Sequence, residues 1–233
     1  MVSVALVGPD GAGKTTIAKR VVVALPLPAR YLYMGDNPAS ANRSLITTRL
    51  RSAAKRAMGR SEDTGPPSAP RTSFEGMGPL RRTVVELRAM LRLFAQVSEE
   101  WYRAAVGRAW ERRGFVVLRD RDFFVDYYGH DIAADRAGRT VGRSLHGFLL
   151  RAIYPRPDLV VCLEAAPEIL LQRKGEGSVE ALSRRAADYQ AAAEHVKRFV
   201  TVDVSKPEND VVAEVSTLVA TFARRARMGR RLR

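Results

Sequence analysis

The sequence predicts an α/β protein with a doubly wound, five-stranded parallel sheet flanked by helices. Two observations carry this prediction. Five short apolar runs rich in β-branched residues indicate buried strands, at 2–7, 31–34, 115–118, 159–163 and 199–202. A segment with helical patterning separates each run from the next, and crossovers of that kind join parallel strands. We therefore expect all 233 residues, 1–233, to form one domain around a single core.

The connections hold the expected helices and one insertion. Helical patterns cover 15–23, 42–58, about 80–112, about 167–197 and a last segment that starts near 207. Residues 59–79 are rich in Gly, Pro, Ser and Thr, which is typical of a flexible loop. Residues 224–233 form a basic tail.

Composition limits the classes of function. Lys and Arg number 39 against 25 Asp and Glu, and the resulting charge of +14 attracts polyanions; arginine-biased codon usage would give the same charge without a function. The single cysteine, Cys162, excludes an internal disulfide and a Cys-based zinc site. His130, His146 and His195 lack metal-ligand spacing. Without a signal peptide or an apolar run of about 20 residues, a cytoplasmic location is expected.

One motif carries chemistry. The segment GPDGAGKT at 8–15 matches G-x-x-x-x-G-K-[ST] and lies between a predicted strand and a predicted helix. Its glycines let successive backbone N–H groups curl around a phosphate chain, and the helix points its positive dipole end at the same anion. Lys14 would reach the β- and γ-phosphates, and the Thr15 hydroxyl would ligate Mg²⁺. The predicted nucleotide-binding residues are Gly8, Pro9, Asp10, Gly11, Ala12, Gly13, Lys14, Thr15 and Thr16.

Two further groups of residues suit phosphate chemistry. Asp120 and Arg121 end the third strand, where ligands of open α/β sheets bind. There a carboxylate can hold Mg²⁺ through water and an arginine can clamp a phosphate; the plainer alternative is an ion pair that caps a strand. Cations also surround glycines at 175–177, which suits a lid that closes over phosphates, although a solvated helix face would have the same composition. These cations are Arg173, Lys174, Arg184 and Arg185.

Four blocks together resemble the thymidylate kinase family: the motif at 8–16, Arg119-Asp120-Arg121, and the segments 157–168 and 202–208. The resemblance implies a central five-stranded sheet and transfer of the γ-phosphoryl group of MgATP to a small acceptor. It implies that Lys14 is the P-loop lysine and that Asp10 touches a sugar hydroxyl of the acceptor. Asp120 and Arg121 correspond to the family's Asp-Arg pair.

The resemblance also implies how the ATP side is completed. Gly11-Ala12 match the branch whose P-loop lacks an arginine, so a catalytic arginine should come from the lid. The candidates are Arg173, Arg184 and Arg185, with Arg173 first because it directly precedes the glycines. Ser205, Lys206 and Pro207 match the loop that packs near the adenine.

Departures from the family pattern leave the acceptor open. Val7 replaces an acidic residue, and an arginine-bearing acceptor-phosphate segment is missing at 33–36. Glu99 stands near the place of a helix arginine, and 122–126 replaces the usual tyrosine-and-serine sequence. The ATP side is intact, so a kinase is predicted more firmly than thymidylate as its acceptor.

Three functions follow as alternatives. The first is a kinase of a nucleoside monophosphate. The second is a kinase of a nucleoside, sugar or glycan intermediate, in which Asp10 or Asp126 would orient or deprotonate a hydroxyl. The third is a nucleotide-gated protein whose basic helix 42–58 and tail bind nucleic acid or an anionic membrane. No specific nucleic-acid recognition is expected, since no such motif is present; a homodimer is left open.

Overall fold

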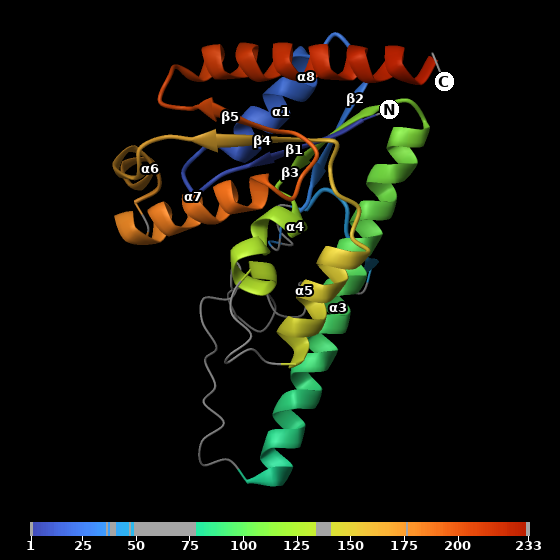
Figure 1. The fold of residues 1–233 in the computed structure, drawn as a ribbon, viewed down its shortest axis with the longest axis vertical. Helices are drawn as coiled ribbons and strands as arrows, with labels where there is room; N and C mark the ends of the chain where they lie inside the picture. The colour runs from blue at the N-terminus through green and yellow to red at the C-terminus, as the bar shows by residue number, and fades with distance from the viewer. Residues whose placement is uncertain are drawn as a thin grey trace.

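The structure is a computed structural model that describes residues 2–35, 37, 41–46, 48, 78–133, 141–175 and 177–231. Its five strands are all parallel, in the order β2-β3-β1-β4-β5, with helices on both faces (Figure 1). The strands are β1 Ser3–Val7, β2 Ala29–Tyr33, β3 Val116–Asp120, β4 Leu159–Glu164 and β5 Phe199–Asp203. The predicted α/β class and all five predicted strands are confirmed.

The helices form two layers. On one face lie α1 Lys14–Ala24 and α8 Glu208–Arg231, which pack against each other (Figure 1). The other elements are α3 Pro79–Arg112, α4 Phe123–Asp126, η1 Tyr128–Ala133, α5 Val141–Ala152, α6 Pro167–Lys174 and α7 Val179–Ala193. Of these, α3, α4, α5 and the end of α7 build the core of the opposite face.

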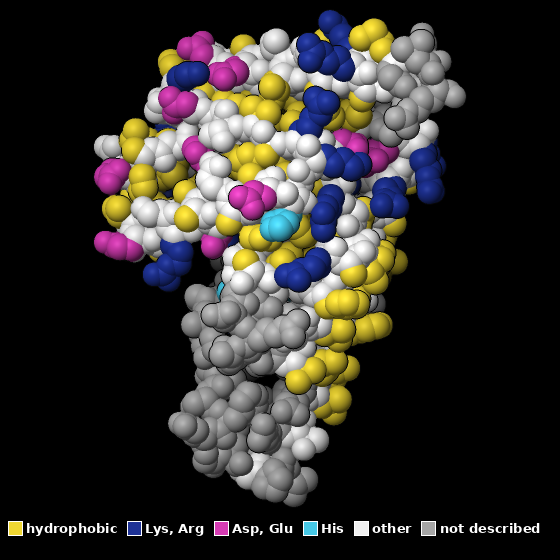
Figure 2. Space-filling view, in the orientation of Figure 1, with side chains coloured by type: hydrophobic (Ala, Val, Ile, Leu, Met, Phe, Trp, Pro, Cys, Tyr) yellow, Lys and Arg dark blue, Asp and Glu magenta, His cyan; other side chains and the backbone are white. Residues whose placement is uncertain are grey.

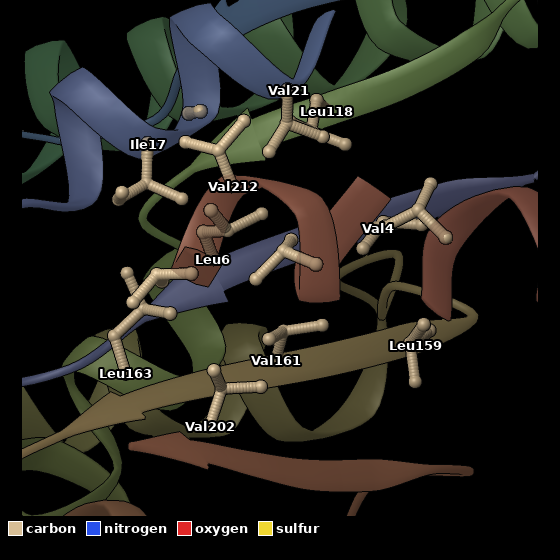
Figure 3. Packing of buried hydrophobic residues seen from close by; sticks show 14 of the residues in the cluster. Val4, Leu6, Ile17, Val21, Leu118, Leu159, Val161, Leu163, Val202 and Val212 are labelled. Carbon is tan, nitrogen blue, oxygen red and sulfur yellow. The ribbon is translucent and has the colours of Figure 1, made fainter. Parts of the chain in front are cut away.

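The strands are apolar throughout because both faces of the sheet are covered. In β1, Val4 and Leu6 pack toward α1 and α8, where they meet Ile17, Val21 and Val212 (Figure 3). The intervening residues of β1 belong to the second core, which faces the aromatic side chains of α4. Burial in two layers explains why these runs lack the polar alternation of a half-exposed strand.

Some sequence expectations need correction. The sequence analysis gives no bounds for the helical segment between the third and fourth strands, where α4, η1 and α5 lie. A four-residue helix is too short to show a period, and α5 contains two glycines, which lower helix propensity. Gly147 is needed because a Cβ there would overlap the carbonyl of Asp131.

Other corrections concern boundaries. The helical stretch expected at 167–197 is two helices, α6 and α7, and Pro79 begins α3 instead of ending the insertion. Residues 224–231 of the expected tail continue α8. The insertion up to 77 and most of the expected helix 42–58 lie outside the described residues. None of the helices that the structure describes is long and apolar enough to cross a membrane.

Candidate phosphate-binding site

The glycine loop joins β1 to α1 at the carboxyl edge of the sheet. Gly8 and Gly11 have positive φ angles of 147° and 87°. A Cβ at Gly8 would overlap the carbonyl oxygen of Leu163, and one at Gly11 would lie 2.5 Å from the carbonyl oxygen of Leu170. These glycines therefore let the loop lie against β4 and α6 in a conformation that other residues would strain.

The side chain of Lys14 is buried against the backbone of the glycine loop. It is 5 % exposed, and Nζ donates to the carbonyl oxygens of Gly8 and Pro9, both at 2.7 Å. Burial lowers the pKa of Lys14 to about 8; Arg121 adds to this effect, and Asp10 opposes it. In the described part of the chain its hydrogen bonds go to backbone carbonyls, and the nearest carboxylate oxygen, Asp10 Oδ1, is 3.8 Å away, so a phosphate would offer it a closer charged partner.

Asp120, at the end of β3, contacts the first turn of α1. Its Oδ2 accepts hydrogen bonds from Thr15 Oγ1 at 2.6 Å and from the Tyr31 hydroxyl at 2.7 Å. Its Oδ1 is buried and has no hydrogen-bond partner in the described part of the chain. A buried carboxylate oxygen without a donor fits a nearby cation or its water.

A magnesium ion fits this donor set. Within the described ranges no three His, Cys, Asp or Glu side chains converge as metal ligands. Mg²⁺ at nucleotide sites needs only one or two protein oxygens, because phosphates and waters supply the others. Thr15 and Asp120, the two residues predicted for the metal, are side by side as that chemistry requires.

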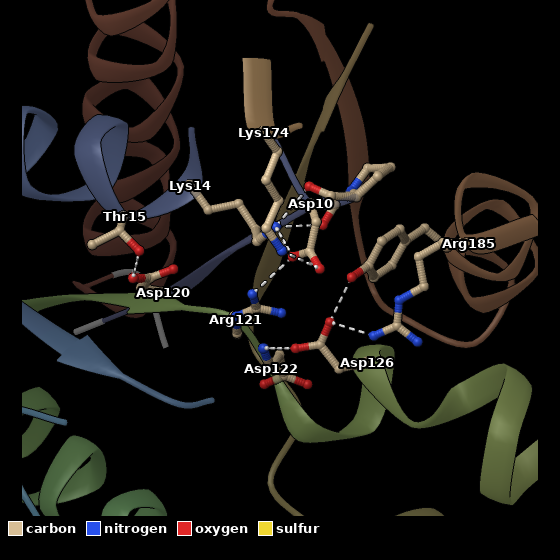
Figure 4. Close-up of polar contacts among 12 residues, drawn as sticks. Asp10, Lys14, Thr15, Asp120, Arg121, Asp122, Asp126, Lys174 and Arg185 are labelled. Carbon is tan, nitrogen blue, oxygen red and sulfur yellow. Dashed lines mark hydrogen bonds and ion pairs between the residues drawn. The ribbon is translucent and has the colours of Figure 1, made fainter. Parts of the chain in front are cut away.

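Asp10 is the centre of a cluster of three cations (Figure 4). Arg121 Nη2 lies 3.1 Å from Oδ1, Lys174 Nζ 3.1 Å from Oδ2, and Lys14 Nζ 3.8 Å from Oδ1. Burial disfavours the charge on Asp10, but Lys14, Arg121 and Lys174 together hold its pKa well below the usual range. A carboxylate of such low basicity suits orienting an acceptor hydroxyl better than deprotonating it.

Arg121 has a strained backbone. Its φ of 76° is the only positive value among the non-glycine residues that the structure describes. Its Cδ would lie 2.6 Å from a Cβ at Gly35, so that glycine leaves room for the arginine to pass. Strain held in this way is common at functional sites.

A second carboxylate, Asp126, faces the same space from α4. It is buried and accepts from the Tyr189 hydroxyl at 2.6 Å, from Arg185 Nη2 at 3.2 Å and from the Asp122 backbone N–H at 3.3 Å. Asp126 therefore ties the expected lid, through α7, to the segment after β3. Figure 4 shows Arg185 and Arg121 on either side of it.

The three lid arginines lie differently. Arg185 contacts Asp126, whereas Arg184 and Arg173 are exposed. Lys174, not Arg173, reaches Asp10. A helix places consecutive residues on different faces, so the composition of 173–185 indicates a basic lid without showing which arginine faces inward.

The loop expected near the adenine lies beside α1. Ser205 donates its backbone N–H and its hydroxyl to Asp203, both at 2.8 Å, and Lys206 pairs with Glu214 at 3.0 Å. Pro207 precedes α8, whose Glu208 contacts Arg20 of α1. Thr16 is exposed on the first turn of α1. These residues share the carboxyl edge of the sheet with the glycine loop.

Sequence reasoning did not single out Arg103. Arg103 is buried; its Nε donates to Glu99 at 2.9 Å and its Nη1 to the Gly35 carbonyl at 2.6 Å. It lies one helical turn after Glu99, the residue that stands where the resemblance leads us to expect an arginine. The i, i+4 spacing of Glu and Arg was the available signal.

Comparison with models of known families and with curated proteins finds no match to this chain.

Proposed function

We propose that this chain is a phosphotransferase of the P-loop type that resembles thymidylate kinase and transfers the γ-phosphoryl group of MgATP to a small acceptor. One observation carries the proposal. The hydroxyl of Thr15, next to the loop lysine, binds Asp120 of a neighbouring strand, whose other oxygen is buried without a partner. The sequence motif alone gives no such pairing with a residue 105 positions away.

Each residue has a role in the proposed reaction. The loop N–H groups and Lys14 would bind the β- and γ-phosphates, and Thr15 and Asp120 would hold magnesium. Bound there, the metal neutralises charge on the phosphate oxygens. Arg121 and Arg185 supply cations beside the acceptor, where negative charge spreads in the transition state.

A nucleoside monophosphate is the first candidate acceptor. Arg121, Arg185 and Lys174 lie together around the space between Asp10 and Asp126, and an acceptor phosphate could take over these cations. A nucleoside, sugar or glycan intermediate is the second candidate. Each of these cations already contacts a carboxylate, and an acceptor without a phosphate does not have to displace that carboxylate. This favours the second candidate.

The test is a phosphoryl-transfer screen with MgATP over nucleoside monophosphates, nucleosides and sugars. We expect turnover with one acceptor class, and loss of turnover in Lys14→Ala with an unchanged circular dichroism spectrum. ATP binding without any turnover would instead favour the nucleotide-gated binding protein. Near-normal turnover of Lys14→Ala would contradict the assignment of the loop.

Asp120→Asn separates metal binding from nucleotide binding. The amide keeps the shape but loses the charge, so Mg²⁺-dependent turnover should fall by about tenfold or more while nucleotide affinity changes little. Tyr31→Phe is the matched control, since it removes only one donor to the same oxygen. Turnover and affinity that fall by the same small factor would exclude a metal role for Asp120.

A further inference from the structure

The opposite edge of the sheet holds a polar pocket. Its volume is about 430 Å³, and it lies at the amino ends of the strands, between the end of α3 and the connection from α5 to β4. Five cationic side chains line it, with two carboxylates. They are Arg108, Arg112, Arg119, Arg156 and Lys197, with Glu111 and Asp158. Figure 2 shows dark-blue side chains gathered in this part of the surface.

The two carboxylates already have partners and do not neutralise the pocket. Asp158 accepts from the backbone N–H of Ser3 at 3.0 Å, and its other oxygen lies 3.7 Å from Lys197 Nζ. Glu111 is 3.5 Å from Arg119 Nη2. The lining therefore keeps an excess of positive charge, which concentrates anions in a concave site.

Arg119 supplies an independent observation. It is 1 % exposed, and Nη1 donates to Asp122 at 3.3 Å and to the Pro155 carbonyl at 3.1 Å. Its Nε is buried and has no acceptor in the described part of the chain. A buried N–H donor that lacks an acceptor, as Nε does, carries a desolvation cost, which a hydrogen-bond-accepting ligand would offset.

Three other arginines of the pocket, Arg108, Arg112 and Arg156, are placed to bind an anion. Arg108 and Arg112 are four residues apart on α3 and so lie on one side of the helix, and both are exposed. Arg156 is held by the carbonyls of His195 and Arg151, at 2.9 and 3.1 Å, and its guanidinium stacks on a ring of α4. This held arginine and the buried Arg119 make the pocket a pre-formed site rather than a loose patch.

We propose that this pocket binds a small phosphorylated molecule, separately from the phosphate loop. Guanidinium groups match phosphate oxygens in pairs, and the volume suits a small ligand better than a macromolecule. Arg119 links the pocket to the segment of the candidate site, because it precedes Asp120 in β3 and its side chain contacts Asp122. The proposal rests on this pocket's own geometry and does not depend on ATP turnover.

Pyrophosphate is the probe, titrated by calorimetry at low ionic strength. The loop would also bind it, so the titration uses Lys14→Ala as well as the unmodified chain. We expect Lys14→Ala to retain one pyrophosphate site. Adding Arg108→Ala and Arg112→Ala to that variant should weaken this site by about tenfold or more. These two side chains are exposed, so their removal should not affect folding.

The control removes the same charge elsewhere. Arg224→Ala with Arg225→Ala, on α8, should leave pyrophosphate binding unchanged. Equal weakening by the control pair would show a general charge effect and overturn the proposal. So would a complete loss of binding in Lys14→Ala alone, since the loop would then be the only anion site. Neither result depends on whether the chain is a kinase.

Discussion

At the scale of single residues, Lys14 should make nucleotide affinity depend on pH. Burial holds its pKa near 8, and a bound polyphosphate would raise that pKa by placing negative charge beside it. A ligand that prefers the protonated lysine binds less tightly once the free lysine loses its proton. Nucleotide affinity should therefore be constant below about pH 8 and should fall above it, by up to about tenfold per pH unit.

Calorimetry between pH 7 and pH 10 measures this effect. Lys14→Gln, which cannot titrate, should bind weakly and show no comparable decline. An affinity that stays level to pH 10 in the unmodified chain would mean that Lys14 does not touch the nucleotide.

The neighbouring arginines of α7 offer a matched pair. Arg185 contacts Asp126 and Arg184 is exposed, although both were predicted from the same basic run. Arg185→Ala should lower kcat by about 10²-fold or more, with a smaller effect on the KM for ATP, because a lid cation acts mainly in the transition state. Arg184→Ala should be close to the unmodified enzyme.

Single-turnover kinetics with the acceptor found in the screen measures this difference. Arg173→Ala belongs in the same series, because the sequence favours it and the structure does not. Three near-normal rates would leave the segment 173–185 as a solvated helix face.

At the scale of elements, a buried polar cluster joins α3, η1 and α5. His146 of α5 has Nδ1 2.7 Å from Asp131 Oδ2 and Nε2 3.1 Å from both carboxylate oxygens of Glu100. Burial opposes charge on this imidazole, but hydrogen bonds to Asp131 and Glu100 raise its pKa to about 9. His146 is therefore charged at neutral pH, and its hydrogen bonds join α5 to η1 and α3.

The pH dependence of stability follows from that pKa. Because the folded-state pKa exceeds the ordinary value of 6.5, the stabilisation is complete below about pH 6.5 and is lost as pH rises through 9. The loss should be about 3 kcal/mol in the free energy of unfolding. Urea unfolding from pH 6 to pH 9.5 measures it, with His146→Gln as the variant that should lack this decline. Parallel curves for the two proteins would show that His146 is neutral when folded.

Elements differ in how well the sequence predicts them. The strands and the glycine loop follow from local patterns, because both faces of the sheet are apolar and the loop is a contiguous motif. The segment 122–156 gives no such pattern, since α4 is short and depends on Asp122 as its N-cap. The partners of Asp10 and the position of Arg103 depend on contacts between distant segments, and one sequence does not show those.

At the scale of the whole molecule, the described residues present an apolar stripe. Nine of the twelve exposed large hydrophobic side chains in the described part of the chain lie on α3, on α5 or just after it. Figure 2 shows yellow hydrophobic side chains gathered along the side of the molecule where α3 runs. The nine are Val84, Leu87, Met90, Leu91, Phe94, Val141, Leu145, Phe148 and Ile153. A patch of this extent is typical of an interface rather than of a free surface.

The stripe predicts the homodimer that the sequence left open. Positions 84, 87, 91 and 94 alternate spacings of three and four residues, as do 141, 145 and 148, and such rows pair with a matching helix. At 34 residues, α3 is about 50 Å long, so two copies could bury a large area.

We therefore expect light scattering after size exclusion to give twice the chain mass of 25.8 kDa. Leu91→Asp with Phe94→Asp should give the single-chain mass, because two buried charges per copy would lack partners. Val23→Asp is the control, since Val23 is 87 % exposed on α1 and lies outside the stripe. A monomer at tens of micromolar in the unmodified chain, or dissociation by the Val23 control, would exclude α3 and α5 as the dimer contact.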